Sequence, residues 1–187
     1  MRRKQAIAAL AILVGLAVCA QNGCADSHSP SDDTQSGQNV QIANPWRDIT
    51  ETEAKELCPH SFGVPDGAEN VVWSAMDADA EGVSGALVQL SFDLNGDSFT
   101  AREQVTGDKA ADISGMHYEW THQDDMTLTN WADGQMKGKY YRYIGEDEWV
   151  DLCTWYDEEA GISYSVSVSS KDLDGFDLQA IAEALCD

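Results

Sequence analysis

The sequence predicts an α+β domain: a curved, mostly antiparallel sheet of about seven or eight strands, with a short N-terminal helix and a C-terminal amphipathic helix. Three observations support this prediction. Residues 162–169 alternate strictly between apolar residues and serines, which is the period of a strand. Asn95-Gly96 is a strong hairpin signal, because a type I′ turn needs positive φ at both positions. The apolar residues of 178–185 recur at helical spacing.

The alternating strand forms the second half of a predicted hairpin. Residues 149–156 supply the first half, with a heavy aromatic load, and 157–161 form the turn. In 162–169 the apolar side chains share one face and the serine hydroxyls share the other. We expect the apolar face to pack against the two helices and the serine face to meet solvent or a polar partner.

Further strands and both helices have local signals. Strands are predicted at residues 71–73, 86–94, 98–105, 116–121, 126–131 and 139–144. The first helix begins at a capping box that opens with Thr50, and it ends before Pro59. Asp174 is predicted to cap the last helix, with Asp177 close to the helix dipole in the first turn.

The chain is strongly acidic. Its 187 residues include 33 Asp or Glu against 11 Lys or Arg, which gives a formal net charge of −22. Removal of Arg2, Arg3 and Lys4 with an export signal leaves 8 basic against 33 acidic residues, or −25. Such a surface repels nucleic acids and anionic lipid headgroups, so we expect no nucleic-acid partner. It attracts basic proteins, although a solvated surface without a specific partner explains the same composition.

Residues 1–20 have the three parts of a secretory signal peptide: a basic start, an apolar run and small residues after it. The apolar run, Ala6 to Val18, has 13 residues, fewer than the about 20 that span a bilayer. Residues 21–43 form a polar linker, and residues 44–187 form a single folded domain. The sequence therefore predicts export, to the cell envelope or beyond it.

Two processing routes fit the end of this signal. Ordinary cleavage after Ala20 releases the chain, whereas lipidation of Cys24 extends the signal to residue 23 and tethers the protein to the membrane. A lipid on Cys24 is the only membrane contact that we expect. Lipidation leaves three cysteines in the domain, enough for one disulfide at most. Cys58 and Cys186 lie at predicted helix ends and are the candidate pair, and Cys153 is expected to be a buried apolar residue.

No constellation of residues predicts catalysis, a metal or a cofactor. His117 and His122 are five residues apart, which would point them to opposite faces of a strand. Asp93 to Asp97 lacks the EF-hand spacing, so a hairpin turn explains it better than calcium. The nucleophile elbow Gly-x-Ser-x-Gly is absent. We therefore expect a protein that is not an enzyme and carries no cofactor.

Aromatic residues are the remaining lead for recognition. The chain has six tryptophans, most of which we expect in the core. Tyr140, Tyr141 and Tyr143 occupy both faces of one predicted strand, so at least one of them should be exposed. Exposed aromatic rings beside acidic loops suit a basic or sugar-bearing partner.

Several short motifs occur together along the domain. They are Asn44-Pro45-Trp46, the Thr50 capping box, Arg102 with Gly107, Asp112-Ile113-Ser114-Gly115, Tyr118 to Trp120, Trp155, Gly161 and Tyr164-Ser165. Together they resemble an uncharacterised extracytoplasmic domain family of secreted proteins and lipoproteins of Gram-positive bacteria, over most of residues 44–186. The resemblance implies a strongly curved antiparallel sheet with flanking helices and no catalytic residues. The additional cysteines and the acidic composition depart from the family pattern.

Three functions remain open at this point. The first is a non-catalytic, monomeric domain that binds an unknown ligand at the bacterial cell envelope. The second is an acidic, inhibitor-like protein that binds a cationic secreted hydrolase, with an association that salt weakens. The third is a hydrolase with paired carboxylates, which would need two close acids in a cleft, one with a raised pKa.

Overall fold

The computed structural model describes residues 44–78, 82 and 84–186, which fall within one compact unit, Ile42–Asp187. The predicted signal peptide, the linker and Cys24 lie outside the described residues. No helix in the described part of the chain is long and apolar enough to cross a membrane.

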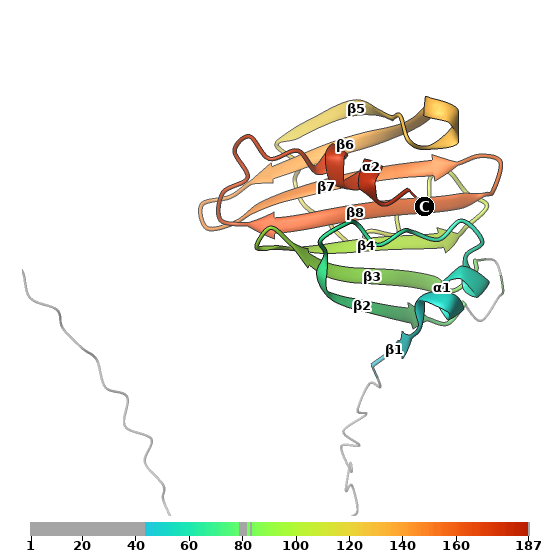
Figure 1. Cartoon of the computed structure of the whole chain (residues 1–187). Coiled ribbons are helices and arrows are strands. Elements are labelled where there is room, and N and C mark those ends of the chain that lie inside the picture. The colour runs from blue at the N-terminus through green and yellow to red at the C-terminus, as the bar shows by residue number, and fades with distance from the viewer. Residues whose placement is uncertain (1–43, 79–81, 83, 187) are drawn as a thin grey trace, which may run out of the picture. The chain divides into compact units, whose positions relative to one another are not determined.

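One eight-stranded sheet dominates the domain (Figure 1). Its strands are β1 Trp46–Ile49, β2 Glu69–Met76, β3 Leu87–Leu94, β4 Asp97–Val105, β5 His122–Leu128, β6 Met136–Ile144, β7 Trp149–Asp157 and β8 Ile162–Ser170. Two α-helices, α1 Glu51–Leu57 and α2 Leu178–Ala184, and a short 3₁₀ helix, η1 Ala132–Gly134, complete the described elements. The sheet is open, and every neighbouring pair is antiparallel. The prediction of a mostly antiparallel sheet of this size with helices is confirmed.

The strand order is β1-β2-β3-β4-β8-β7-β6-β5. Two four-strand meanders are therefore joined along β4 and β8, in the middle of the sheet. The chain leaves β4 in the middle and enters β5 at an edge, so residues 106–121 have to travel past β8, β7 and β6. We call this segment the connector. Neighbouring strands lie about 4.8 Å apart, so the connector crosses roughly 19 Å of sheet.

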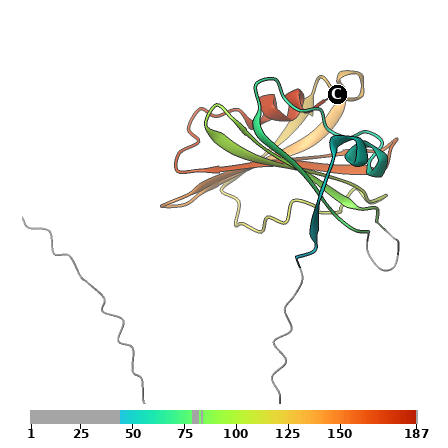
Figure 2. The ribbon, with the colours of Figure 1, turned by 60° about the horizontal axis from the view of Figure 1, so that its bottom comes forward.

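The two faces of the sheet are covered differently (Figure 2). Both α-helices lie on one face, which we call the helix face, and the connector lies on the other, the connector face. The helix face carries the main apolar core, where Val166 of β8 pairs with Ala101 of β4 and Cys153 of β7. Leu178 and Leu185 bring α2 into the same core. This arrangement follows from the alternation of apolar residues along each strand.

Local details differ from the prediction in four places. The N-cap of α2 is Asp177, whose carboxylate accepts from the Ala180 N–H at 3.1 Å, so the cap predicted at Asp174 is wrong. Residues 116–121 form no strand, because they belong to the connector, which crosses the face of the sheet. The strand predicted at 126–131 runs instead from His122 to Leu128, as β5. Residues Trp46–Ile49 form an edge strand that the pattern did not predict.

Three of the four serines in the predicted row of β8 are buried. Ser163, Ser165 and Ser167 are 2 to 6% exposed. The Ser163 hydroxyl hydrogen-bonds the hydroxyl of Thr106, at the start of the connector, at 2.8 Å. The prediction left solvent or a polar partner open for this row. Ser169 is exposed, whereas the connector returns over the other three serines and supplies a polar partner from within the chain.

The predicted disulfide between Cys58 and Cys186 is not formed in this structure, and both residues are thiols. Cys58 is fully buried at the end of α1, where its N–H bonds the Ala54 carbonyl. The Cys186 thiol donates instead to the Asn130 carbonyl at 2.9 Å. Cys153 is fully buried, in agreement with its predicted role as an apolar core residue.

Candidate functional site

Arg102 of β4 holds the connector onto its face of the sheet. Its guanidinium donates to the Ser114 carbonyl at 2.5 Å and to the Gln89 side chain at 2.9 Å. Asp112 shapes the same stretch by accepting from the N–H and hydroxyl of Ser114. Gly115 follows with φ of +66°, and a Cβ there would lie 2.7 Å from the Arg102 guanidinium. This position therefore requires glycine.

Beyond that anchor, a pocket of about 430 Å³ lies between the connector and strands β6 to β8. We call it the small pocket. Its apolar and aromatic lining includes Ile113, Met116, Trp120, Tyr141 and Leu152. Its polar lining includes Lys109, Asp112, Lys137, Lys139, Thr154 and Ser163. The volume falls within the range of small-molecule sites, which combine apolar walls with a few polar groups.

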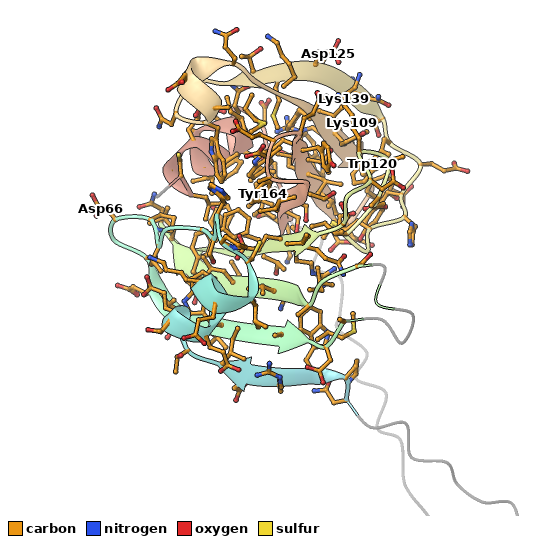
Figure 3. All side chains as sticks on the ribbon, turned by 90° about the vertical axis from the view of Figure 1, so that its right-hand side faces the viewer. Asp66, Lys109, Trp120, Asp125, Lys139 and Tyr164 are labelled. Carbon is orange, nitrogen blue, oxygen red and sulfur yellow. The ribbon has the colours of Figure 1, made fainter. Side chains whose placement is uncertain are left out.

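The three lysines of the small pocket have different partners. Lys109 pairs with Glu158 at 2.5 Å, and Lys139 pairs with Asp125 at 2.5 Å. Lys137 donates to the hydroxyl of Thr127 at 2.8 Å. Figure 3 shows Lys109, Lys139 and Trp120 on the same flank of the domain. Because these ion pairs are largely solvent-exposed, exchanging one partner for another costs little free energy.

Four half-buried aromatic residues form a continuous cluster at the edge of the small pocket. Tyr143 and Tyr118 have ring centroids 4.8 Å apart, Tyr118 and Trp120 are 5.5 Å apart, and Trp120 and Tyr141 are 5.3 Å apart. Two of these rings come from the connector and two from β6. Rings at such distances hold one another in place, and each of the four keeps part of its surface exposed.

Of the three tyrosines predicted for recognition, the structure brings two together and separates the third. Tyr141 and Tyr143 belong to this cluster. Tyr140 lies on the helix face, where the Arg142 guanidinium sits 5.7 Å from its ring centroid. Burial and the nearby Asp151 raise the pKa of Tyr140. Tyr140 is therefore part of the packing of the other face.

A second pocket, of about 740 Å³, opens at the adjoining ends of the strands, and we call it the large pocket. Its charged lining is Lys55, Lys109, Lys137, Asp157, Glu158 and Glu159, so lysines and acids are equal in number. Trp131 and Tyr164 line it too, with ring centroids 5.1 Å apart. The two pockets share four lining residues, Lys109, Lys137, Tyr156 and Tyr164. We call the two pockets together the groove.

A fully buried carboxyl group supports one wall of the large pocket. Glu103 of β4 is 0% exposed and accepts from the Ser61 hydroxyl at 2.5 Å and from the Phe62 N–H at 3.1 Å. Burial raises the pKa of Glu103 to about 8, against an ordinary value of 4.5. The Tyr164 hydroxyl donates to the His60 carbonyl at 3.1 Å, which fixes the same segment. Glu103 is a positioning group, because it is sealed from any ligand in the groove.

The lysines of the groove were missed at the sequence level, although they left a signal. Lys137, Lys139, Tyr141 and Tyr143 alternate along one strand, which places them on a single face. Lys109 could not be found this way, because it lies on the connector, which has no period. Among the described residues, no group of three or more His, Cys, Asp or Glu side chains is arranged to hold a metal ion.

Comparisons with family models, with curated proteins and with solved structures give no match to this chain.

Proposed function

We propose that this protein is a non-catalytic domain, exported from a bacterial cell, that binds a ligand of the cell envelope in the groove formed by its two pockets. One observation carries the proposal. Four of the five lysines of the described residues line the groove, next to a cluster of four aromatic rings, in a chain with a net charge of −22. A purely solvating acidic surface would not need this concentration of cations and rings.

The ionisable groups of the groove favour binding over chemistry. A hydrolase with paired carboxylates needs an acid of raised pKa in contact with substrate. Glu103 has the raised pKa, but it is fully buried and bonded to Ser61 and Phe62. Asp157, Glu158 and Glu159 line the large pocket at the β7–β8 turn, and Glu158 is paired with Lys109. These acids can orient a ligand or compete with it.

The proposal is tested by co-sedimentation of the protein with envelope preparations of its host. Trp120→Ala and Lys137→Met change the groove, whereas Lys171→Met removes one exposed lysine that lines neither pocket. We expect the first two variants to bind several-fold less and the third to bind like the original protein. Equal binding by all three variants would show that the groove is not the binding site.

The inhibitor-like function remains the second candidate, because the acidic residues also gather on exposed edges. Asp124 and Asp125 are exposed on the edge strand β5, and Glu158 and Glu159 are exposed at the β7–β8 turn. This function predicts association with cationic secreted hydrolases that weakens steeply with salt. Replacing Asp124 and Glu159 by amides should weaken that association, whereas Trp120→Ala should leave it unchanged.

Tethering is a separate part of the proposal. Mass spectrometry of the mature N-terminus from the native host decides between a diacylglyceryl group on Cys24 and a free Gln21. Either outcome is compatible with a binding role, and the lipid would fix the domain at the membrane through its N-terminal linker.

A further inference from the structure

We propose that the small pocket binds an organic anion whose flat apolar body packs against Trp120 and whose negative group lies among Lys109, Lys137 and Lys139. This inference rests on the proposed function and specifies the chemistry of its ligand.

The walls of the small pocket select an apolar body. Leu152 of β7 is buried beneath the pocket, and Ile113 and Met116 come from the connector above it. Trp120 presents a half-buried ring, held by Tyr141 at a centroid distance of 5.3 Å. A ring system inserted between connector and sheet removes apolar surface on both sides from water.

The charges of the small pocket select an anion. Three lysines and one acid line it, and the carboxylates that pair with two of these lysines, Glu158 and Asp125, lie outside its lining. The single acid, Asp112, is occupied by the N–H and the hydroxyl of Ser114. The large pocket makes a useful contrast, because its three lysines and three acids give no preference for one sign.

The present partners of the lysines mark where the negative group would go. Glu158 occupies Lys109 and Asp125 occupies Lys139, each at 2.5 Å, and both carboxylates are highly exposed. Lys137, the third lysine of the pocket, has only a neutral hydroxyl as hydrogen-bond acceptor among the described residues. An incoming anion can bind Lys137 directly and replace Glu158 at Lys109. Glu158 is thus an internal competitor for the ligand.

The experiment uses naphthalene-2-carboxylate, its neutral counterpart 2-naphthamide, and 2-naphthyl phosphate, titrated into the protein by calorimetry. The three molecules share one ring system and differ in the charge and nature of the polar group. We expect both anions to bind at least about tenfold more tightly than the amide, the typical effect of one charge-assisted hydrogen bond. Tighter binding of the phosphate would assign a phosphorylated ligand, and tighter binding of the carboxylate a carboxylated one.

Four variants locate the site. Lys137→Met should weaken binding of the two anions by about tenfold and leave the affinity for the amide unchanged. Lys171→Met, which makes the same chemical change outside both pockets, should leave all three affinities unchanged. Glu158→Gln should tighten binding of the anions more than Glu159→Gln, since only Glu158 occupies Lys109.

Equal affinity for the amide and the anions would overturn the inference, as would no binding of any of the three molecules. Equal loss in Lys137→Met and Lys171→Met would overturn it too, because general surface charge would then explain the binding. If the naphthalene ligands fail while groove variants still reduce envelope binding, the ligand assignment falls and the proposed function stands. If the anions bind the small pocket but envelope material does not bind at all, the proposed function falls instead.

Discussion

The two faces of this sheet are covered by different kinds of structure. The helix face is closed by α1, α2 and the chain between α1 and β2, around a continuous apolar core. The connector face is closed by one segment without regular structure, and the small pocket remains beneath it. The small pocket therefore follows from the strand order, which forces a long crossing of this face.

Charged groups follow the same division. On the helix face Glu103 and Asp151 are both 0% exposed, and the two carboxyl groups have different kinds of hydrogen-bond partner. Asp151 is bonded to Arg142 by two hydrogen bonds, at 2.6 and 2.7 Å, whereas Glu103 accepts only from Ser61 and Phe62. The lysines of the connector face are exposed and hold exchangeable partners. Charge on the helix face should therefore control stability, and charge on the connector face should control binding.

The largest expected effect is at Arg142. Replacing Arg142 by Met leaves the fully buried Asp151 carboxylate without its cation, which should lower the free energy of unfolding by about 3–5 kcal/mol. Denaturant unfolding measures this loss. The double variant Arg142→Met with Asp151→Leu should recover most of it, because no buried charge is left. A loss below about 1 kcal/mol in the single variant would contradict the assignment.

The pH dependence of stability tests Glu103. The folded protein keeps the Glu103 proton up to about pH 8, whereas the unfolded chain releases it near 4.5. The contribution of this group is therefore complete below pH 4.5 and declines as the pH rises to about 8, by at most about 1.4 kcal/mol per pH unit. Glu103→Gln, which imitates the protonated acid, should remove this slope. Identical slopes in both proteins would show that the carboxyl is ionised in the fold.

The anchor of the connector should show an intermediate effect. Arg102→Met removes the donors to the Ser114 carbonyl and to Gln89, at an expected cost of about 1–3 kcal/mol. Hydrogen exchange should accelerate in residues 112–116 more than in β3 and β4. Arg102→Lys keeps one donor and should lie between the two proteins. Unchanged exchange of the connector in Arg102→Met would mean that other contacts hold it.

The smallest effect on stability is expected at Lys137. The side chain is exposed and its one hydrogen bond is to the Thr127 hydroxyl, so Lys137→Met should change the free energy of unfolding by less than about 0.5 kcal/mol. Thermal unfolding of Lys137→Met beside Lys171→Met measures this. A cost above about 1 kcal/mol would give Lys137 a structural role and weaken the contrast between the faces.

The sequence predicts the sheet well, because its signals are local. Alternation identifies β8, and Asn95-Gly96 identifies the β3–β4 hairpin, where Asn95 has φ of +55° and Gly96 of +94°. The pairing of β4 with β8 leaves no local signal, since it joins residues 57 or more positions apart. Without that pairing the path of the connector cannot be predicted.

The site was predictable only in part for the same reason. Tyr141 and Tyr143 were identified because they alternate on a strand, and the same pattern held the neglected Lys137 and Lys139. Lys109 and Trp120 join them only through the fold, because the connector has no period to indicate where its side chains point. The burial of Ser163, Ser165 and Ser167 could not be predicted, because alternation specifies a face but says nothing about what later covers it.

The central claim is that the connector face holds a site for an organic anion. The chain offers a direct test in its six tryptophans, because they report on both faces in one spectrum. The measurement is the shift of each indole N–H resonance as naphthalene-2-carboxylate is added. We predict the largest shift for Trp120, which lines the small pocket, and none for Trp73 and Trp149 on the helix face. Shifts that are largest at Trp73 or Trp149, or a Trp120 resonance that does not move at saturation, would contradict the claim.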